Sequence, residues 1–498
     1  MAYFAEPSGS PVLSVLFAAC GYIPIFCLMM QEKRPFLIGF AWFFLLSLIQ
    51  VSWLTQTTYH GIYILFVYVG IALWLALQFA LLAFLIRKSC LAAAGAWTLM
   101  EWGRHYVLCG YAFTPMGLPL AALPTSLQCA SVVGLLGLGL VVILTNLIGV
   151  RALIARSEKQ LLLFFVMALS PYVLGGLILS KREAGLAKTD HLSVALVQTG
   201  LSADEKIPLS SMAAFIPCDL QWIRIVSALC EGSQDLDLIV LPESALPFGA
   251  NRPIYPKEWV NSLIPGIPFE KEYASNRDIA HLIAKKWDAD VVIGLDDADE
   301  KGHYNAAFCV TPFSQSAERY EKQILVPLSE YLPFEGVRSL VARYGITSFF
   351  THGEGDKLLK GRINYAPTIC YEECFSRIAR TYKRLGGELL VNMTNDAYFP
   401  NTSLPRRHFD LGRIGAVEVG LPLVRACNSG VTAAVDSFGR ILGRVDGEWT
   451  LKALKLEVPL HSYSTLYSQY GDFPIILISI TLLCVPFFFS LAQKKTGS

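Results

Sequence analysis

The sequence predicts a protein with two kinds of structure, a multi-pass α-helical membrane domain and an α/β domain outside the membrane. Long apolar runs fill residues 1–183 and 473–491, whereas residues 190–460 alternate between short β-prone runs and helix-like stretches. The chain of 498 residues is 53% hydrophobic and 16% charged, while an average soluble protein has about 25% charged residues. This shortage of charge is typical of a chain that crosses a membrane.

Seven apolar runs are long enough to cross a bilayer, which takes about 20 residues. Six of them lie in the N-terminal domain, and the seventh is close to the C-terminus. The predicted spans are Pro11–Met30, Pro35–Leu54, Gly61–Ile86, Cys90–Leu108, Ser131–Val150, Leu161–Ser180 and Phe473–Leu491. The flank before the first run has no Lys or Arg, so this run does not look like a cleaved signal peptide.

The basic residues of the short loops alternate between the two sides of the membrane. Lys or Arg follows the first, third, fifth and last spans, whereas the loops Thr55–His60 and Cys109–Ala130 have neither. Because loops rich in Lys and Arg stay on the cytoplasmic side, we expect an outer N-terminus and a cytoplasmic C-terminus. The domain of residues 190–460 is then on the outer side.

Three ionisable residues interrupt the end of the fourth predicted span, namely Glu101, Arg104 and His105. Such residues within a membrane can mark a functional site. At spacings of three and four residues on a helix they can also pair with one another near the water interface. The spacing favours the second, structural interpretation.

The α/β pattern of residues 190–460 contains eight candidate strands separated by helical stretches such as Tyr273–Lys286 and Cys374–Leu385. Repeated strand–helix units predict a sheet with helices on both of its faces. The candidate strands are Leu192–Gln198, Leu236–Leu241, Asp290–Leu295, Ala306–Val310, Ala366–Ile369, Leu389–Met393, Leu423–Ala426 and Thr432–Asp436.

The strongest candidate for a nucleophile is Cys370, which follows the apolar run Ala366–Ile369 and precedes Tyr371 and Glu372. A free cysteine in an apolar strand is usually a small buried hydrophobe. Two upstream segments change this interpretation, because each also presents a charged side chain beside a strand. Glu243 follows a predicted strand in L-P-E-S-A, and Lys322 lies in Y-E-K-Q-I-L-V-P.

The Glu243, Lys322 and Cys370 contexts together resemble the Glu-Lys-Cys triad of the nitrilase, or carbon–nitrogen hydrolase, superfamily. Three longer stretches resemble one branch of it, the bacterial apolipoprotein N-acyltransferases: L-V-P-L-S-E-Y-L-P-F (325–334), V-N-M-T-N-D-A-Y-F (391–399) and V-R-A-C-N-S-G-V-T-A (424–433). The resemblance covers nearly the whole chain. It departs in its topology, because that family usually has one more early span and a cytoplasmic N-terminus.

The resemblance implies an αββα sandwich whose catalytic residues lie at strand ends. It implies that Cys370 attacks an acyl carbonyl and holds the acyl group as a thioester. A thiol with its ordinary pKa of about 8.5 is mostly protonated at neutral pH and needs a base, for which Glu243 is the candidate. Lys322 would stabilise the oxyanion of the tetrahedral intermediate and keep Glu243 ionised. The ordinary alternative is a buried Glu–Lys pair beside a buried cysteine.

Further residues match motifs of the family and receive supporting roles. Glu330 resembles an additional essential glutamate that positions Lys322 or relays a proton, although it can also be a solvated loop carboxylate. Tyr371 and Glu372 match the family's C-Y-E, with Glu372 expected to orient the site. Asn395 and Asp396 match N-D-A and are expected to order their loop or to contact substrate.

Apolar loops are the candidates for lipid contact, since exposed aromatic patches mark interaction surfaces. Phe248, Phe334 and Tyr398 are the candidate substrate-binding residues of these loops. Tyr398 stands where the family commonly has Trp. Such loops can instead fold back onto their own core. The loops concerned are Leu246–Phe248, Tyr331–Phe334, Ser348–Phe350 and Tyr398–Phe399.

The predicted function is transfer of an acyl chain from a phospholipid to the N-terminal amine of a diacylglyceryl-cysteine lipoprotein, in a bacterial inner membrane with the catalytic domain on the periplasmic side. The alternatives are a membrane-tethered amidase or nitrilase with the same triad and, from another class, a transporter or channel. Against a transporter, the spans lack a path of ionisable residues.

We expect a monomer and no cofactor. The net charge of +1 gives no case for nucleic acid, and the 12 cysteines show no metal-binding spacing.

Overall fold

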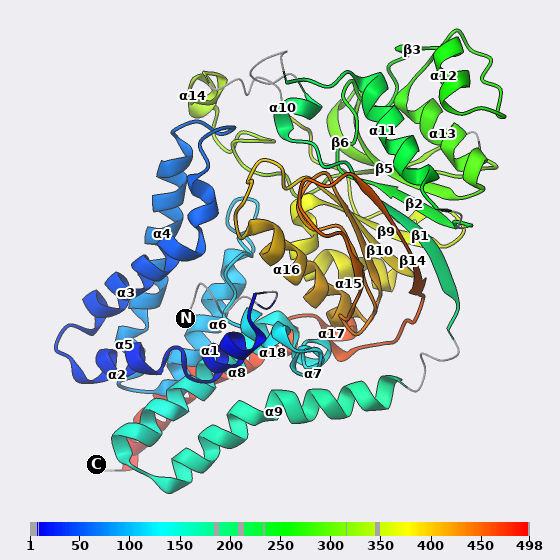
Figure 1. Ribbon diagram of the computed structural model, residues 1–498. Coiled ribbons are helices and arrows are strands. Elements are labelled where there is room, and N and C mark those ends of the chain that lie inside the picture. The colour runs from blue at the N-terminus through cyan, green and yellow to red at the C-terminus, as the bar shows by residue number, and fades with distance from the viewer. Residues whose placement is uncertain are drawn as a thin grey trace. The chain divides into compact units, whose positions relative to one another are not determined.

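The computed structural model describes residues 7, 9–183, 189–207, 214–232, 235–314, 316–343 and 349–496. The chain forms two compact units, which Figure 1 shows in a single colour gradient from the N-terminus to the C-terminus. The first, called the membrane unit here, consists of Met1–Ala184 and Ser464–Ser498. The second, called the α/β unit, consists of Gly185–Tyr463.

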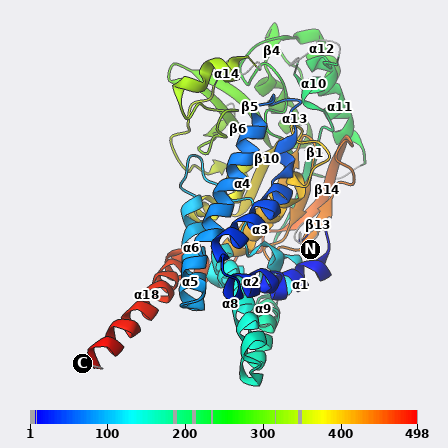
Figure 2. The ribbon, with the colours of Figure 1, turned by 90° about the vertical axis from the view of Figure 1, so that its left-hand side faces the viewer.

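The membrane unit is built from helices and short 3-10 turns, with α3 and α4 packed alongside each other (Figure 2). Its helices are α1 (Pro11–Cys20), α2 (Ile23–Gln31), α3 (Pro35–Gln50), α4 (Ile64–Leu81), α5 (Ala83–Ile86), α6 (Cys90–Arg104), α7 (Pro124–Leu127), α8 (Ala130–Ala155), α9 (Glu158–Glu183), α17 (Leu466–Tyr470) and α18 (Phe473–Thr496). The 3-10 turns are Ser52–Thr55 and Leu118–Ala122.

Four helical stretches among the described residues are long and apolar enough to cross a membrane, namely Pro11–Gln31, Ile64–Ile86, Ala130–Ala155 and Glu158–Glu183. This confirms a multi-pass membrane protein. The helix α3 and the part of α18 up to Cys484 are apolar but shorter, and α6 has 15 residues. The count of seven spans therefore stays a prediction. Only 11% of the most apolar 18-residue stretch of α9 is buried. This helix therefore has an outward-facing apolar surface.

The first predicted span is broken between α1 and α2 at Gly21 and Tyr22. Asn146 of α8 compensates the break, because its Oδ1 accepts from the Tyr22 N–H at 2.9 Å and its Nδ2 donates to the Ala18 carbonyl at 2.8 Å. A backbone group left unpaired in an apolar environment costs several kcal/mol. One buried asparagine thus makes a helix break possible inside an apolar bundle.

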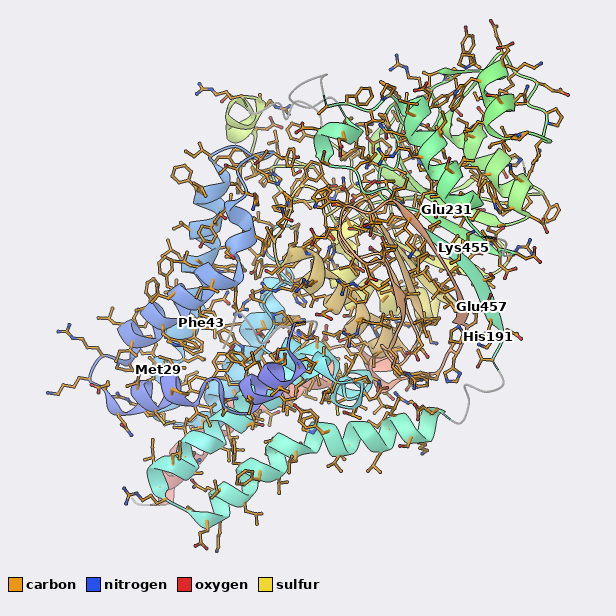
Figure 3. The ribbon with its side chains drawn as sticks, in the orientation of Figure 1. Met29, Phe43, His191, Glu231, Lys455 and Glu457 are labelled. Carbon is orange, nitrogen blue, oxygen red and sulfur yellow. The ribbon has the colours of Figure 1, made fainter. Side chains whose placement is uncertain are left out.

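Aromatic rings fill the core of the membrane unit around Phe79. The Phe79 ring centroid is 4.5 Å from that of Phe43 and 5.7 Å from that of Phe26, both nearly parallel to it, while Trp97 meets it edge-on at 5.6 Å. Met29 and Phe43, labelled in Figure 3, are both buried in this core. Close aromatic packing of this kind contributes beyond the area that it buries.

The Glu101–Arg104 pair forms within the membrane unit as the spacing predicts, with 3.8 Å between Arg104 Nη1 and Glu101 Oε1. Glu101 also accepts from the Met116 N–H at 2.8 Å, and Arg104 donates to Gln78 Oε1 at 2.6 Å. The guanidinium carbon lies 4.6 Å from the Trp97 ring centroid. Both residues thereby tie α6 to neighbouring segments, which agrees with the structural interpretation.

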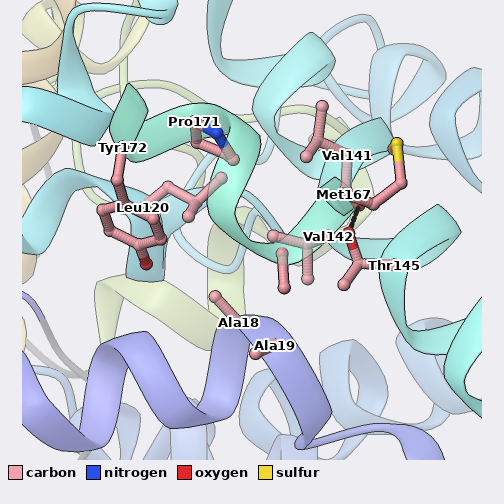
Figure 4. A pocket seen from close by; sticks show the side chains of 10 residues that line it. Ala18, Ala19, Leu120, Val141, Val142, Thr145, Met167, Pro171 and Tyr172 are labelled. Carbon is pink, nitrogen blue, oxygen red and sulfur yellow. Dashed lines mark hydrogen bonds between the residues drawn. The ribbon is translucent and has the colours of Figure 1, made fainter. Parts of the chain in front are cut away.

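A small cavity of about 10 Å³ lies between α1, α8 and α9 (Figure 4). Its walls are mostly apolar, and the Thr145 hydroxyl donates back to the Val141 carbonyl at 2.7 Å instead of reaching a ligand. The space is about that of one water molecule. It is too small for an acyl chain. The lining residues are Ala18, Ala19, Leu120, Val141, Val142, Thr145, Met167, Ala168, Pro171 and Tyr172.

The α/β unit contains two six-stranded sheets, in the orders β14-β1-β2-β5-β6-β7 and β13-β12-β11-β10-β9-β8. The first consists of β14 (Lys452–Pro459), β1 (His191–Gln198), β2 (Leu238–Leu241), β5 (Asp290–Asp299), β6 (Gly302–Val310) and β7 (Glu318–Glu321). The second consists of β13 (Ile441–Arg444), β12 (Ala433–Val435), β11 (Leu423–Cys427), β10 (Leu389–Thr394), β9 (Asn364–Ile369) and β8 (Leu359–Lys360). A small hairpin pairs β3 (Tyr255–Pro256) with β4 (Tyr273–Ala274).

The two sheets face each other, with β1 and β2 contacting β10 and β11, and helices cover both outer faces. The helices α11 (Cys218–Cys230) and α13 (Asn276–Trp287) pack on the first sheet, and α15 (Ser376–Arg384) and α16 (Leu404–Val419) pack on the second. This is the αββα sandwich expected from the resemblance. Shorter helices are α10 (Ala203–Lys206), α12 (Lys257–Leu263) and α14 (Arg338–Ala342), with 3-10 turns at Glu335–Val337 and Cys370–Cys374.

Lys455 of β14 ties the outer helix α11 to its sheet. Its ammonium donates to the backbone carbonyls of Leu229 and Glu231 at 2.8 Å each, and Figure 3 labels Lys455 and Glu231 at this contact. These are carbonyls that the end of a helix leaves without partners. A single lysine thereby fixes the C-terminal end of α11.

All eight candidate strands are present, although several boundaries move. Two helix predictions begin too early: Tyr273 and Ala274 form β4 before α13 begins at Asn276, and Cys374 ends a 3-10 turn before α15 begins at Ser376. A Ser275 capping box, in which Ser275 accepts from the Asp278 N–H, fixes the start of α13. The prediction omits the outer strands β7, β8, β13 and β14.

Candidate active site

The three predicted triad residues follow three different strands of the sandwich. Glu243 comes two residues after β2, Lys322 directly after β7, and Cys370 directly after β9. The Lys322 Nζ lies 3.1 Å from Glu243 Oε1, and its electrostatic environment includes both Glu243 and Cys370. The structure therefore brings the three side chains together. Lys322 is 1% exposed and Glu243 is 6% exposed.

Lys322 lies between two carboxylates. Its ammonium donates to Glu243 Oε1 at 3.1 Å and to Glu330 Oε1 at 2.7 Å. Asn305 of β6 reaches the same two oxygens, donating at 2.7 Å to Glu243 and at 3.1 Å to Glu330. The second Glu330 oxygen accepts from the Val326 N–H at 2.8 Å. Glu330 is thus fixed by its own loop and holds Lys322 in place.

The backbone around Glu243 is tightly constrained. Ser244 has a φ of +40°, a region that non-glycine residues rarely adopt. On the neighbouring strand β5, a Cβ at Gly294 would lie 2.7 Å from the Glu243 Cα, so a side chain there would displace the carboxylate. Such local strain is typical of functional sites held by their surroundings.

Cys370 has the same kind of backbone, with a φ of +52°. Its carbonyl accepts from Asn392 Nδ2 at 3.2 Å and lies 3.1 Å from His408 Nε2. Because β9 and β10 run parallel with Ile369 opposite Met393, the two strands end near each other and place Asn392 beside Cys370. These contacts hold the cysteine in a conformation that would otherwise cost about 1–3 kcal/mol.

The surroundings set the charge states of the nucleophile and the lysine. Burial and the nearby Glu243 raise the pKa of the Cys370 thiol well above its usual range, and Lys322 opposes this only in part. This corrects the assumption of an ordinary thiol and strengthens the need for a base. Burial disfavours the Lys322 charge, but Glu243 and Glu330 hold the pKa of Lys322 well above its usual range.

Glu372 joins the nucleophile turn to the Lys322 segment. Its oxygens accept from the backbone N–H groups of Ile369 at 2.8 Å, Gln323 at 2.6 Å and Ile324 at 3.2 Å, and from the Tyr320 hydroxyl at 2.9 Å. Burial raises the pKa of Glu372 to about 7, although the backbone donors favour its anionic form. These contacts fit the orienting role predicted for Glu372.

A second group of charged side chains lies behind Cys370. Arg425 of β11 donates to Glu373 Oε1 at 2.8 Å and to Asp396 Oδ2 at 3.0 Å. His408 of α16 lies 3.1 Å from Asp396 Oδ1 and 3.2 Å from Glu373 Oε1. Burial alone would raise the pKa of Asp396, but Arg425 and His408 together hold it at about 2. We call these four residues the Arg425 network.

The remaining predicted residues occupy different surroundings. Tyr371 is buried, with its ring edge-on to Phe375 at 4.9 Å, and Asn395 orders its turn by accepting from the Ala397 N–H. Burial, Glu243 and Asp296 raise the pKa of Tyr398, which places its phenol near the triad. Because Asp396 is bound within the Arg425 network, its contacts fit an ordering role. Substrate contact by Asn395, Asp396 and Tyr398 stays a prediction.

The two predicted loop aromatics are exposed. Phe334 is 64% exposed and Phe248 is 46% exposed. Phe248, at a φ of +70°, lines a cavity of about 450 Å³ together with Arg252, Tyr255 and Trp259. Their contact with substrate stays a prediction, and Ser348 of the predicted apolar loops lies outside the described residues.

Sequence reasoning missed the partners that hold the triad. Asn305 lies inside a long strand, and Arg425 and His408 lie in stretches where an isolated basic residue is normally exposed. A fully buried arginine needs a buried carboxylate, so the acidic pair Glu372 and Glu373 was the available signal. Among the described residues, no group of three or more His, Cys, Asp or Glu side chains is arranged to hold a metal ion.

Comparisons with known proteins find relatives of both parts of the chain. The sequence profile described as "Carbon-nitrogen hydrolase" matches residues 194–467, and that of the "Apolipoprotein N-acyltransferase N-terminal domain" matches residues 7–148. Proteins named apolipoprotein N-acyltransferase are similar over nearly their full length. The one from Chlamydia muridarum is 31% identical, covering 99% of this chain and 96% of its own, and the one from Chlamydia trachomatis is 32% identical, covering 99% and 95%.

The likeness extends beyond that genus. The apolipoprotein N-acyltransferase of Geobacter metallireducens is 28% identical, covering 94% of this chain and 89% of its own. The match to both profiles favours an acyltransferase over a tethered amidase, because the N-terminal domain profile belongs to the acyltransferases. The chain therefore belongs to the apolipoprotein N-acyltransferase family, whose members are multi-pass membrane enzymes of lipoprotein N-acylation.

Proposed function

We propose that the enzyme moves an acyl chain from a phospholipid to the N-terminal amine of a diacylglyceryl-cysteine lipoprotein through a thioester on Cys370. The observation that carries this proposal is the position of Lys322, whose ammonium is hydrogen-bonded to both Glu243 and Glu330 next to a cysteine with a left-handed backbone. The arrangement offers a nucleophile, a base and an electrophilic cation at one point, as covalent acyl transfer requires.

In the first half-reaction, Glu243 takes the proton of the Cys370 thiol as sulfur attacks the ester carbonyl of the phospholipid. The carbonyl oxygen becomes an oxyanion, which the Lys322 ammonium stabilises. The tetrahedral intermediate then collapses, the bond from carbon to the ester oxygen breaks, and Glu243 returns the proton to the departing alkoxide. The products are an acyl thioester on Cys370 and a lysophospholipid.

In the second half-reaction, the neutral amine of the lipoprotein attacks the thioester carbonyl, and Lys322 again stabilises the oxyanion. Glu243 takes a proton from the attacking nitrogen, the carbon–sulfur bond breaks, and the proton passes to the leaving thiolate. An amide and a free thiol result. The same base and the same cation therefore serve both steps, and atoms and charge balance without a cofactor.

The two substrates and the topology are parts of this proposal. Phospholipids surround a multi-pass membrane protein and are therefore its most available acyl donors. The lipoprotein N-acylation of the family supports a lipoprotein amine as the acceptor. The loop charges favour a bacterial inner-membrane protein with its α/β unit on the periplasmic side. A reporter that works only outside the cytoplasm should be active when fused after Tyr59 or Asn251. It should be silent after Lys88 or Lys159, and the reverse pattern would contradict this orientation.

The experiment that tests the proposal compares two cysteines of one turn. Cys370→Ala should abolish both the acyl adduct and transfer to a diacylglyceryl peptide. Cys374→Ala, which changes another buried thiol of the same 3-10 turn, should retain both. Transfer by a correctly inserted Cys370→Ala protein would show that Cys370 is not the nucleophile.

A further inference from the structure

A second buried lysine reaches the base from a part of the chain remote from Lys322. Lys206, the last residue of α10, is 2% exposed. Its ammonium donates to the backbone carbonyl of Glu243 at 2.9 Å. In the sequence, Lys206 lies outside the motifs that carry the family resemblance.

The local sequence holds Lys206 in a fixed position. Ser202 and Glu205 form a capping box, in which the Ser202 hydroxyl accepts from the Glu205 N–H and the Glu205 carboxylate accepts from the Ser202 N–H. The Lys206 carbonyl accepts from Gln221 Nε2 at 3.1 Å. Burying a lysine side chain costs free energy, because the side chain loses rotamer freedom and the ammonium loses its hydration. Here the turn is built so that the ammonium points inward.

The Glu243 carbonyl receives two donors from separate segments. Asn428, which follows β11, donates its Nδ2 at 2.7 Å to the same oxygen that accepts from Lys206. The Ser244 hydroxyl donates to Asp296 Oδ1 at 2.7 Å. The base is thus held from its backbone by one cationic donor and one neutral donor, a pair whose effects can be separated by substitution.

Lys206 also adds a positive charge to the surroundings of the base. Burial lowers the pKa of Lys206 to about 8, while Glu243 and Asp296 favour its charged form. The side chain therefore carries its charge at neutral pH. A neighbouring cation favours the ionised form of a carboxylate, and the electrostatic environment of Lys206 includes Glu243.

We propose that Lys206 is a positioning residue for the general base: it fixes the Glu243 backbone and, as a second cation, keeps the Glu243 side chain in its carboxylate form. This inference rests on the proposed function, in which Glu243 takes the thiol proton. Other charged or titratable groups act on the same carboxylate, so the effect of Lys206 has to be measured against theirs. These groups are Lys322, Glu330, Asp296, Cys370 and Tyr398.

The test compares Lys206→Met and Lys206→Gln with Asn428→Ala in the full-length protein. The first two remove the charge, and Lys206→Gln keeps a donor for the Glu243 carbonyl. Asn428→Ala removes the neutral donor together with the oxygen that accepts from the Thr199 hydroxyl, and it leaves the Lys206 charge in place. The measurement is the rate at which the acyl adduct forms on Cys370 from a phospholipid, followed by mass spectrometry between about pH 5 and pH 7, below the pKa of Lys206 of about 8.

All three variants should be slower than the unchanged protein. Only the two Lys206 variants should move the acid limb of the rate profile to higher pH, because they remove a cation that favours the carboxylate form of the base. An unmoved limb in either folded Lys206 variant, or an equal shift in Asn428→Ala, would overturn the inference. If the unchanged protein forms no adduct on Cys370, it is the proposed function that fails.

Discussion

Two clusters in the α/β unit place one cation between two carboxylates, and we propose a catalytic role for only one of them. In the triad, Lys322 lies between Glu243 and Glu330. In the Arg425 network, Arg425 lies between Glu373 and Asp396. The clusters are adjacent, since His408 of the network contacts the carbonyl of Cys370. Composition alone therefore does not separate a catalytic cluster from a structural one.

The two clusters differ in how the hydrogen-bond donors of the cation are bound. Arg425 uses a planar fork whose three nitrogens all donate to fixed acceptors, to Glu373, to Asp396 and to the Val431 carbonyl. Such a guanidinium holds both carboxylates in one fixed plane. Lys322 is a compact ammonium with three rotatable donors, of which Glu243 and Glu330 take two. A third can meet an oxyanion.

The largest expected effect comes from removing the base. Glu243→Gln should slow thioester formation by about 10²–10⁴-fold at neutral pH, which is the usual contribution of a general base. Raising the pH supplies thiolate without a base, so the adduct on Cys370 should partly recover. Because burial raises the pKa of Cys370, recovery should be confined to the upper end of a range from about pH 7 to 9.5. Mass spectrometry of the adduct measures both.

Removing the cation should be nearly as severe but should respond differently to pH. Lys322→Ala should slow thioester formation and transfer alike by about 10²–10³-fold, the usual loss for one oxyanion donor. Lys322→Arg should not rescue it, because a planar fork cannot place its charge where the ammonium was. Equal alkaline recovery in Glu243→Gln and Lys322→Ala, or none in either, would mean that the two roles are assigned wrongly.

Substitutions in the Arg425 network should lower the stability of the protein, and any loss of activity should follow from that loss of stability. Arg425→Met leaves two buried carboxylates without their cation and should lower the free energy of unfolding by about 3–5 kcal/mol. The matched control is Arg440→Met, which removes the cation beside Asp436. It should cost less than Arg425→Met, because Asp436 keeps its backbone donors from Phe438 and Arg440. Denaturant titration in detergent compares them. A fully stable Arg425→Met protein that cannot form the adduct would place Arg425 in the reaction itself.

A smaller effect concerns Glu372, whose pKa burial raises from 4.5 to about 7. The folded protein then binds more protons than the unfolded chain between these values. The stabilisation that Glu372 contributes to the folded protein is fully present below about pH 4.5. It is lost as the pH rises to about 7, at up to about 1.4 kcal/mol per pH unit. Thermal denaturation should show this slope in the unchanged protein and a shallower one in Glu372→Gln. Parallel slopes would contradict the raised pKa.

The sequence was most informative where local chemistry and position coincide. Cys370, Glu243 and Lys322 were identified because each stands beside an apolar run in a specific context, and runs such as Leu389–Met393 have a hydrophobic pattern that marks a buried strand. The membrane helices follow from length and polarity alone.

What the sequence could not predict depends on pairing between distant segments. Lys206 and Asn428 are separated by more than two hundred residues, yet both donate to the Glu243 carbonyl. Strand β14 contains several charged residues, is half-buried along most of its length and lies at a sheet edge beside β1, so its apolar signal is weak. The break at Gly21 is invisible in an apolar run because Asn146, which stabilises it, lies on another helix.

The central claim is that a thioester on Cys370 is the intermediate that delivers the acyl chain. A single-turnover chase tests it most directly. The full-length protein is loaded from a phospholipid with an isotopically labelled acyl chain, freed of excess lipid and mixed with a diacylglyceryl-cysteine peptide. We predict that the label leaves Cys370 at the same rate and in the same amount as labelled N-acyl peptide appears. Labelled peptide formed while the Cys370 adduct persists, or formed without any adduct, would contradict the account.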